Sequence, residues 1–286
     1  MITIYDLKDS FHYAMHGMGE YRGFCHTNSK EAFSFWYQRG IRIFEVDVAE
    51  TDDREFVCIA HHLDYKTLKR LGIKDIPDSP NSAWFLRQKL LPRLTGGLTP
   101  LSLRNLTELL REHGDLILMM DLFGQFSEGT MARFACRMNE LTADDLQLRK
   151  RVLVEVYNKD MLDEVRGNCS DIHIIYGIDG GDRRCDYTVS AGQLREWGIE
   201  FVSFPWHYRT KYPGRLQELT NSGMTVFSRT IDNLREKALR SAGVNVMLID
   251  TYYRSIKRRI YTRMRFVCDL IYSACKRKVD GFLAQQ

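Results

Sequence analysis

The sequence predicts a single α/β domain built as a closed (β/α)8, or TIM, barrel. Short apolar runs alternate along the chain with segments of helical spacing, which is typical of parallel strands covered by helices. So many units within 286 residues favour a closed barrel over an open sheet. The composition is 44% hydrophobic, as expected of a sizeable core, and the six prolines and 20 glycines mark no linker. We therefore expect a barrel over residues 1–252, followed by a basic C-terminal helix and tail, 253–286, packed on it.

Nine apolar runs are candidate strands, one more than the barrel needs. The run at 56–60 follows its predecessor after the short polar turn AETDDRE, which is too short for a helical crossover, so we expect a hairpin-like extension. Helical spacing is clearest in SLRNLTELLREHG (102–114), where leucines form one stripe before a glycine. Residues 63–100 show neither a strand pattern nor a helical pattern and predict an irregular insertion at the barrel mouth. The candidate strands are 12–15, 41–48, 56–60, 116–122, 152–157, 172–178, 199–204, 224–228 and 244–250.

The second candidate strand, IRIFEVDV, carries two carboxylates in an otherwise apolar run. Glu45 and Asp47 stand two residues apart, so both side chains leave the same face of the sheet. Two carboxylates that converge in apolar surroundings repel each other unless a cation or protons lie between them. This strand is the first indication of a metal site.

Other polar residues lie near the ends of candidate strands, where the active sites of such barrels are found. Asp121 ends one apolar run, and His16 and His61 follow two others. Carboxylates from neighbouring strands make an oxygen site suited to one divalent cation, Mg²⁺ or Ca²⁺. The two histidines can act as acid and base beside an anion held there.

Three further residues lie on or beside candidate strands. Glu155, within VLVEVY, is either a polar group of the site or the buried partner of an arginine. Trp206, in the WHY segment, can form a wall of the substrate pocket, although simple packing is the favoured explanation. We expect Asp250, after VNVMLI, to cap the helix that follows it rather than take part in catalysis.

Composition excludes several classes of protein. The N-terminus has no basic segment followed by a long apolar one, and no run approaches eighteen apolar residues, so neither a secretion signal nor a transmembrane helix is expected. The seven cysteines are scattered without a CxxC pair, which indicates reduced thiols and a cytoplasmic location rather than a zinc site. A net charge of +4 is too small to predict a nucleic-acid partner.

The order of these segments resembles the glycerophosphodiester phosphodiesterases, which share a barrel with phosphatidylinositol-type phospholipases C and sphingomyelinases D. HG (16–17) stands where that family has His-Arg-Gly, and TNSKEAF (27–33) where it has Glu-Asn-Thr followed by Glu-Ala-Phe. FEVDV matches its Glu-x-Asp strand and CIAHH the strand that ends in its second histidine. Four more blocks follow in the expected order and extend the resemblance over residues 11–252: LTPLSLRNLTELL, LILMMDL, VFSRTIDN and VNVMLIDTY.

The resemblance implies a reaction and a role for each matching residue. The family cleaves a phosphodiester, often through attack by a neighbouring hydroxyl of the substrate itself to give a cyclic phosphate. His16 and His61 would be the acid/base pair, and Glu45, Asp47 and Asp121 the metal ligands. The expected partner is a small or lipid-derived phosphodiester, with positioning and electrostatics supplying most of the catalysis.

Two cations of the family pattern are missing. Gly17 and Met18 follow His16 where an arginine is expected, and Phe123 stands where a lysine follows the acid of the fourth strand. Thr27 also replaces the glutamate of Glu-Asn-Thr, and Ser228 replaces a late tryptophan. Arg22, in the next loop, is the expected substitute for phosphate binding. The alternative function is a barrel without turnover that binds a phosphorylated ligand, a membrane or a protein partner.

The C-terminal segment 252–278 is amphipathic and strongly basic. Apolar residues recur at spacings of three and four. The segment also contains nine Lys and Arg residues and only one acidic residue, Asp269. One interpretation is the last barrel helix with a solvated face. The other is peripheral binding, through 254–278, to an anionic membrane, where each basic residue contributes about 1 kcal/mol.

Overall fold

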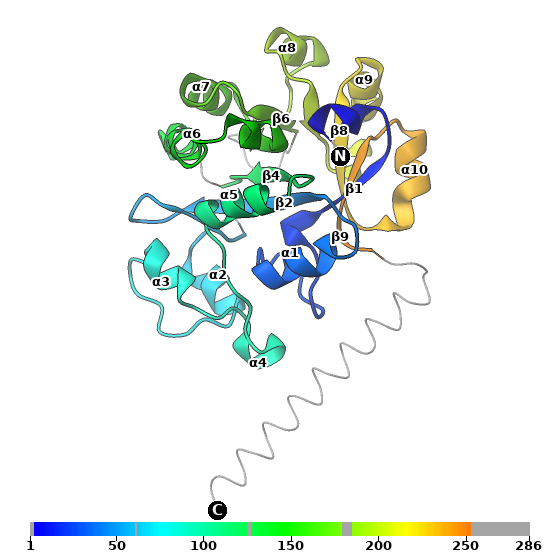
Figure 1. Cartoon of the computed structure of the whole chain (residues 1–286). Coiled ribbons are helices and arrows are strands. Elements are labelled where there is room, and N and C mark those ends of the chain that lie inside the picture. Colours follow the sequence, from blue (N-terminus) through cyan, green and yellow to red (C-terminus); the bar gives the residue numbers. More distant parts are fainter. Residues whose placement is uncertain (1–2, 61, 125–126, 179–184, 253–286) are drawn as a thin grey trace, which may run out of the picture.

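In a computed structural model of the chain, the described residues are 3–60, 62–124, 127–178 and 185–252. They form the predicted barrel, with eight parallel strands in one closed sheet and helices around its outside (Figure 1). The strands follow the order β1-β9-β8-β7-β6-β5-β4-β2, and pairing of β1 with β2 closes the ring. The eight strands are β1 (His12–Met15), β2 (Ile43–Glu50), β4 (Ile117–Asp121), β5 (Val152–Val156), β6 (His173–Gly177), β7 (Phe201–Ser203), β8 (Thr225–Asp232) and β9 (Val246–Thr251).

The ninth run forms the expected hairpin. Strand β3 (Phe56–Cys58) pairs antiparallel with the end of β2, with Val48 opposite Cys58, and does not enter the ring. The turn at Thr51 is closed by a hydrogen bond that the Thr51 backbone N–H donates to the Glu55 carbonyl. The prediction that this run extends its neighbour is therefore confirmed.

The helices on the outside of the barrel have clear local signals. The helix predicted over 102–114 is observed as α5 (Leu103–Glu112), and its leucine stripe is buried against the sheet. Ser102 caps it by accepting a hydrogen bond from the Asn105 backbone. The other outer helices are α1 (Lys30–Tyr37), α6 (Thr130–Leu141), α7 (Lys159–Asn168), α8 (Ala191–Glu196), α9 (Arg215–Asn221) and α10 (Glu236–Ser241), and short 3-10 helices are η1 (Ile4–Lys8), η2 (His16–Met18), η3 (Leu146–Arg151), η4 (Trp206–Arg209) and η5 (Asn233–Arg235).

The insertion over 63–100 is partly helical. It contains α2 (Tyr65–Arg70), α3 (Ser82–Leu86) and α4 (Pro92–Thr95), which project together on one side of the barrel (Figure 1). Its apolar side chains form a separate small core with Ala49, Val57 and Ile59. The β2–β3 hairpin is thus the base on which the insertion is built.

The inside of the barrel has its own core, distinct from the one between strands and helices. Inward-facing residues alternate along each strand, and Ile4 and Leu7 of η1 join them. This apolar layer fills the half of the barrel where the strands begin. It consists of Ile4, Leu7, Ala14, Ile43, Ile117, Met119, Leu153, Ile175, Phe201, Phe227, Val246 and Leu248.

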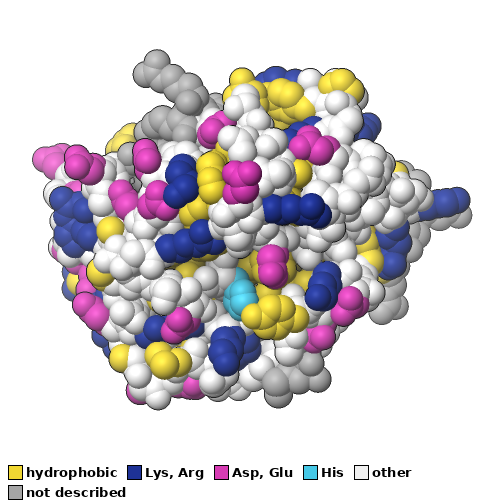
Figure 2. Space-filling view, turned by 90° about the horizontal axis from the view of Figure 1, so that it is seen from above, with side chains coloured by type: hydrophobic (Ala, Val, Ile, Leu, Met, Phe, Trp, Pro, Cys, Tyr) yellow, Lys and Arg dark blue, Asp and Glu magenta, His cyan; other side chains and the backbone are white. Residues whose placement is uncertain are grey.

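The face of the molecule in Figure 2 carries Lys and Arg side chains mixed with Asp and Glu, without a patch of one sign. Such a face is suited to solvent rather than to a polyanion. None of the described helices is both long and apolar enough to span a membrane. The basic helix predicted over 253–286 lies outside the described residues.

Candidate active site at the barrel mouth

A polar layer follows the apolar one inside the barrel, toward the ends of the strands. Because inward-facing residues alternate, the next inward positions after Ile43, Met119 and Leu153 are occupied by carboxylates. Strand register then aligns Asp47 with Asp121, and Asp121 with Glu155. The cavity at this level is lined by His16, Glu45, Asp121, Glu155, Tyr157, Ile178, Ser203, Pro205, Arg229 and Leu248.

Three of the carboxylates converge closely enough to hold one cation. Glu45, Asp47 and Asp121 each offer an oxygen, and these oxygens lie within 4.8 Å of one another. All three side chains are at least 96% buried, with exposures of 1, 3 and 4%. Glu45 Oε1 is buried without a hydrogen-bond partner among the described residues. An orphaned carboxylate oxygen beside two other carboxylates fits a hard divalent cation, as predicted for Mg²⁺ or Ca²⁺.

The protein holds these carboxylates in place through neighbouring groups. The Asn28 amide Nδ2 donates to Asp47 Oδ2 at 2.8 Å, while the Asp47 backbone N–H donates to Asn28 Oδ1 at 3.0 Å. Tyr157 donates its hydroxyl to Asp121 Oδ1 at 2.8 Å. Fixed orientation of ligands by a surrounding layer of hydrogen bonds is typical of metal sites.

Burial makes the carboxylates reluctant to ionise when no cation is bound. Burial, and next the Asp47 charge, raise the pKa of Glu45 well above its usual range and that of Asp121 to about 7. Burial, and next Asp121, likewise raise the pKa of Glu155. When these carboxylates ionise, they repel one another, and this electrostatic strain is relieved when a metal cation binds between them.

This strain predicts that stabilisation by metal depends on pH. In the metal-free protein the pKa values of Glu45 and Asp121 exceed their unfolded values near 4, so both groups lose their contribution to stability as pH rises, and Asp121 loses it between about 4 and about 7. Added Mg²⁺ or Ca²⁺ binds the ionised carboxylates and restores it. We expect the increase in Tm on adding metal to be small near pH 5 and largest near pH 7.5, as measured by calorimetry against EDTA. An increase that does not change with pH would contradict this.

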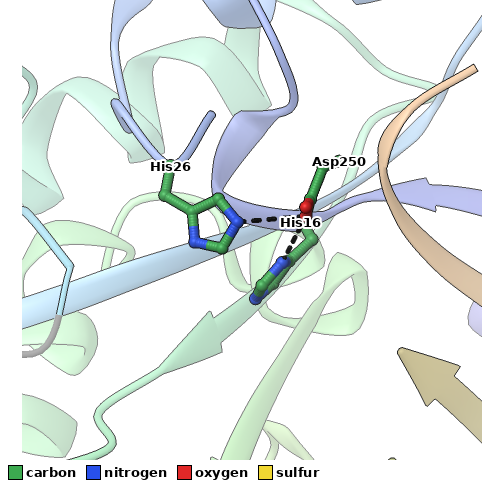
Figure 3. A group of neighbouring side chains, drawn as sticks. All are labelled: His16, His26 and Asp250. Atoms are coloured by element: carbon green, nitrogen blue, oxygen red, sulfur yellow. Dashed lines mark hydrogen bonds and ion pairs between the residues drawn. The ribbon is translucent and has the colours of Figure 1, made fainter. Parts of the chain in front are cut away.

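His16 lies beside the carboxylates and is oriented by Asp250. Asp250 Oδ1 lies 2.8 Å from His16 Nδ1 and 3.0 Å from His26 Nε2, so two imidazoles approach one carboxylate (Figure 3). The two imidazole rings pack edge to face, with their centroids 4.2 Å apart. Burial lowers the pKa of His16 to about 4 against the opposing effect of Asp250. A neutral His16 whose Nδ1–H donates a hydrogen bond to the Asp250 carboxylate keeps its proton on Nδ1 and leaves Nε2 free of a proton, as a base requires.

Gly17 makes this close packing possible. Its φ is +55°, in the left-handed region, and a Cβ there would lie 2.7 Å from the Cα of His26. Its backbone N–H donates to Glu45 Oε2. The glycine after His16 thus links the histidine pair to the carboxylates.

The remaining predicted residues lie in different places. Glu155 lines the cavity, where burial raises its pKa and the nearby charge of Arg229 lowers it by less, so its role in the site stays a prediction. Arg22 donates to the carbonyl of Thr95 in α4 at 2.7 Å and does not line the cavity. Trp206 packs under Arg209, whose guanidinium lies 4.3 Å from its ring centroid, and also lies outside the cavity lining. His61 lies outside the described residues. The proposed roles of Arg22, Trp206 and His61 therefore stay predictions.

Sequence reasoning missed His26, Arg229 and the role of Asp250. The strand predicted at 224–228 continues to Asp232, which places Arg229 two residues after the inward-facing Phe227. Asp250 likewise follows Leu248 by two within β9, and its carboxylate contacts two histidines, while the helix that it was expected to cap lies outside the described residues. A longer strand with the same alternation would have indicated Arg229, whereas Asp250 already lay within the predicted strand 244–250 and only its partners were unknown. His26 lies in a loop and had no such signal.

Gly177 offers a mild test of the cavity. An added Cβ would contact the Tyr157 ring and lie 2.7 Å from Glu155 Oε1, so both side chains must shift. We expect Gly177→Ala to lower the activity of the site by about 10- to 100-fold, since small misplacements of catalytic groups have that effect. Gly167→Ala on α7, where the Cβ meets open space, is the matched control and should keep full activity. Unchanged kcat/KM in Gly177→Ala would place these side chains outside the reaction.

The chain matches no model of a known protein family, and no curated protein matches it. Solved structures, by contrast, superpose over most of their length. A glycerophosphodiester phosphodiesterase from Parabacteroides distasonis has a TM-score of 0.65 at 19% identity, covering 90% of this chain and 99% of that one. The Thermotoga maritima glycerophosphodiester phosphodiesterase has a TM-score of 0.59 at 18% identity, covering 84% and 94%.

A phosphodiesterase from Oleispira antarctica, solved with its product sn-glycerol-3-phosphate, has a TM-score of 0.64 at 16% identity and covers 85% of this chain and 94% of that one. All three likenesses are of low identity, so they concern the fold. The chain therefore has the (β/α)8 barrel fold seen in the glycerophosphodiester phosphodiesterases.

Proposed function

We propose that the chain is a metal-dependent phosphodiesterase, a divergent member of the glycerophosphodiester phosphodiesterase family. Its substrate would be a glycerophosphodiester or a related phosphodiester, including one derived from a lipid head group. The observation that carries the proposal is the polar layer at the barrel mouth, where three buried carboxylates lie beside a histidine oriented by an aspartate. The product bound to the Oleispira antarctica enzyme supports a small phosphodiester as substrate.

Each part of the site has a role in this reaction. Glu45, Asp47 and Asp121 would hold Mg²⁺ or Ca²⁺, which when bound would neutralise charge on the phosphate oxygens. Asp250 fixes the proton of His16 on Nδ1, so Nε2 faces the phosphate. A hydroxyl of the substrate attacks phosphorus and gives its proton to one histidine, and the leaving alkoxide takes a proton from the other. His16 is one of this pair, and His61 is the predicted second.

The test is turnover of a panel of phosphodiesters with and without metal. The panel contains bis(p-nitrophenyl) phosphate, glycerophosphocholine, glycerophosphoinositol and lysophospholipids, each with Mg²⁺, Ca²⁺ or EDTA. We expect released alcohol only in the presence of metal, and the same assay on His16→Ala identifies any contaminating enzyme. A folded protein that binds metal but cleaves none of them would contradict the proposal and favour the non-catalytic barrel.

A further inference from the structure

We propose that Arg229 is the residue that binds the phosphate of the substrate, in place of the cations that this chain lacks after His16 and Asp121. This inference rests on the proposed function and deepens it. Gly17 and Phe123 occupy the positions where the related family carries its arginine and lysine. Among the described residues that line the cavity, Arg229 is the only Lys or Arg.

Arg229 lies where a bound phosphate must enter. It is on β8, faces the inside of the barrel and lines the same cavity as His16, Glu45 and Asp121. Its Nη1 lies 3.3 Å from His16 Nε2, the atom that faces the reacting group. Arg229 is partly exposed, whereas the three carboxylates are buried, so a ligand that enters from the mouth meets its guanidinium early.

The charges at the mouth require such a residue. The three carboxylates of the proposed metal site, when ionised, and one divalent cation would leave a net charge of −1, to which an ionised Glu155 in the same cavity would add, and a phosphodiester brings another −1. Without a further cation the substrate is repelled at close range and low dielectric. Arg229 supplies the missing positive charge, and neighbouring groups, chiefly Tyr157 and Glu155, raise its pKa against the effect of burial, so it stays charged.

An arginine is also the suitable cation for this position. Its planar guanidinium can bind two phosphate oxygens at once, while a lysine offers a single point of charge. The bridging and terminal oxygens of a diester held this way would lie next to His16 Nε2. Arg229 would therefore position the phosphate as well as attract it.

The rival role is a counter-ion that only neutralises Glu155 and Asp121. The two roles separate when phosphate binding and metal binding are measured apart. A counter-ion competes with metal for the carboxylates, so its removal tightens Mg²⁺ binding and leaves phosphate affinity at saturating Mg²⁺ unchanged. If Arg229 instead binds phosphate directly, its removal weakens phosphate affinity at saturating Mg²⁺.

The experiment compares wild type, Arg229→Lys and Arg229→Gln by titration calorimetry with inorganic phosphate and with sn-glycerol 3-phosphate at saturating Mg²⁺. Arg240→Gln, on α10 and paired with Glu236, is the matched control. We expect Arg229→Gln to weaken the binding of both anions by about 100-fold, the usual effect of losing hydrogen bonds to a charged group, with Arg229→Lys in between and the control unchanged. In turnover, the loss should appear mainly as a higher KM.

Anion affinity in Arg229→Gln equal to that of wild type would overturn the proposal, as would a wild type that binds neither anion. Melting curves of the variants identify any that fail to fold, and Arg229→Lys then carries the comparison. If Arg229→Gln loses anion binding while wild type cleaves no diester, the phosphate site stands and only the proposed reaction fails.

Discussion

Replacing His16 with alanine is expected to lower kcat/KM for the best phosphodiester by about 10³- to 10⁴-fold, the upper range for loss of a general acid or base. His16 lies at the end of β1 and lines the cavity with the carboxylates. Its Nδ1 lies 2.8 Å from Asp250, so only Nε2 can exchange a proton with the substrate. Alanine leaves that position without a proton donor or acceptor, which steady-state kinetics at saturating metal will measure.

Asp250→Asn tests whether the position of the proton on His16 matters, because it leaves the histidine itself in place. Asparagine keeps the size of the side chain but can donate its amide to Nδ1, which would move the His16 proton to Nε2, the wrong atom for a base. We therefore expect most of the loss seen in His16→Ala, with metal affinity retained. His12→Ala is the matched control, because His12 lies at the opposite end of the same strand and outside the cavity lining. Full activity in Asp250→Asn would remove Asp250 from the mechanism.

The sequence could predict the barrel because period and connection length are local properties. Apolar runs separated by helical segments predict parallel strands, and the short turn before Phe56 predicts a hairpin, both of which are confirmed. Convergence of Glu45 and Asp47 on one face follows from the two-residue period of a strand. Asp121 could be added because barrel strands all end at the same mouth.

The histidine and aspartate pair could not be predicted in the same way. It depends on closure of the barrel, which brings Met15 of β1 opposite Ile249 of β9 although more than 200 residues separate them. No local pattern indicates that the last strand returns to the first at that register. Asp250 was therefore interpreted as a helix cap, and His26, in a loop, was not assigned to the site. Arg229 was missed for a different reason, since the predicted strand ended one residue before it.

Replacing Glu45 with glutamine is expected to abolish measurable metal binding and to lower kcat/KM by about 10³-fold or more, several kcal/mol of lost charge stabilisation. Glu45 is the most buried of the three carboxylates, and its Oε1 has no hydrogen-bond partner among the described residues. Glutamine has the same shape but offers the cation a neutral oxygen in place of a charged one. Calorimetric titration with Mg²⁺ and Ca²⁺, followed by kinetics, measures both effects.

Without metal, Glu45→Gln should be as stable as the metal-free wild type or more stable. Burial keeps Glu45 reluctant to ionise, so glutamine resembles the protonated state that the empty site prefers and removes repulsion from Asp47 and Asp121. A higher Tm in EDTA together with lost metal binding would show that function, rather than folding, requires the charge. Glu108→Gln, exposed on α5, is the matched control and should change neither quantity. Metal binding of wild-type strength in Glu45→Gln would mean that the cation lies elsewhere, because a neutral amide oxygen binds a hard divalent cation more weakly than a carboxylate does.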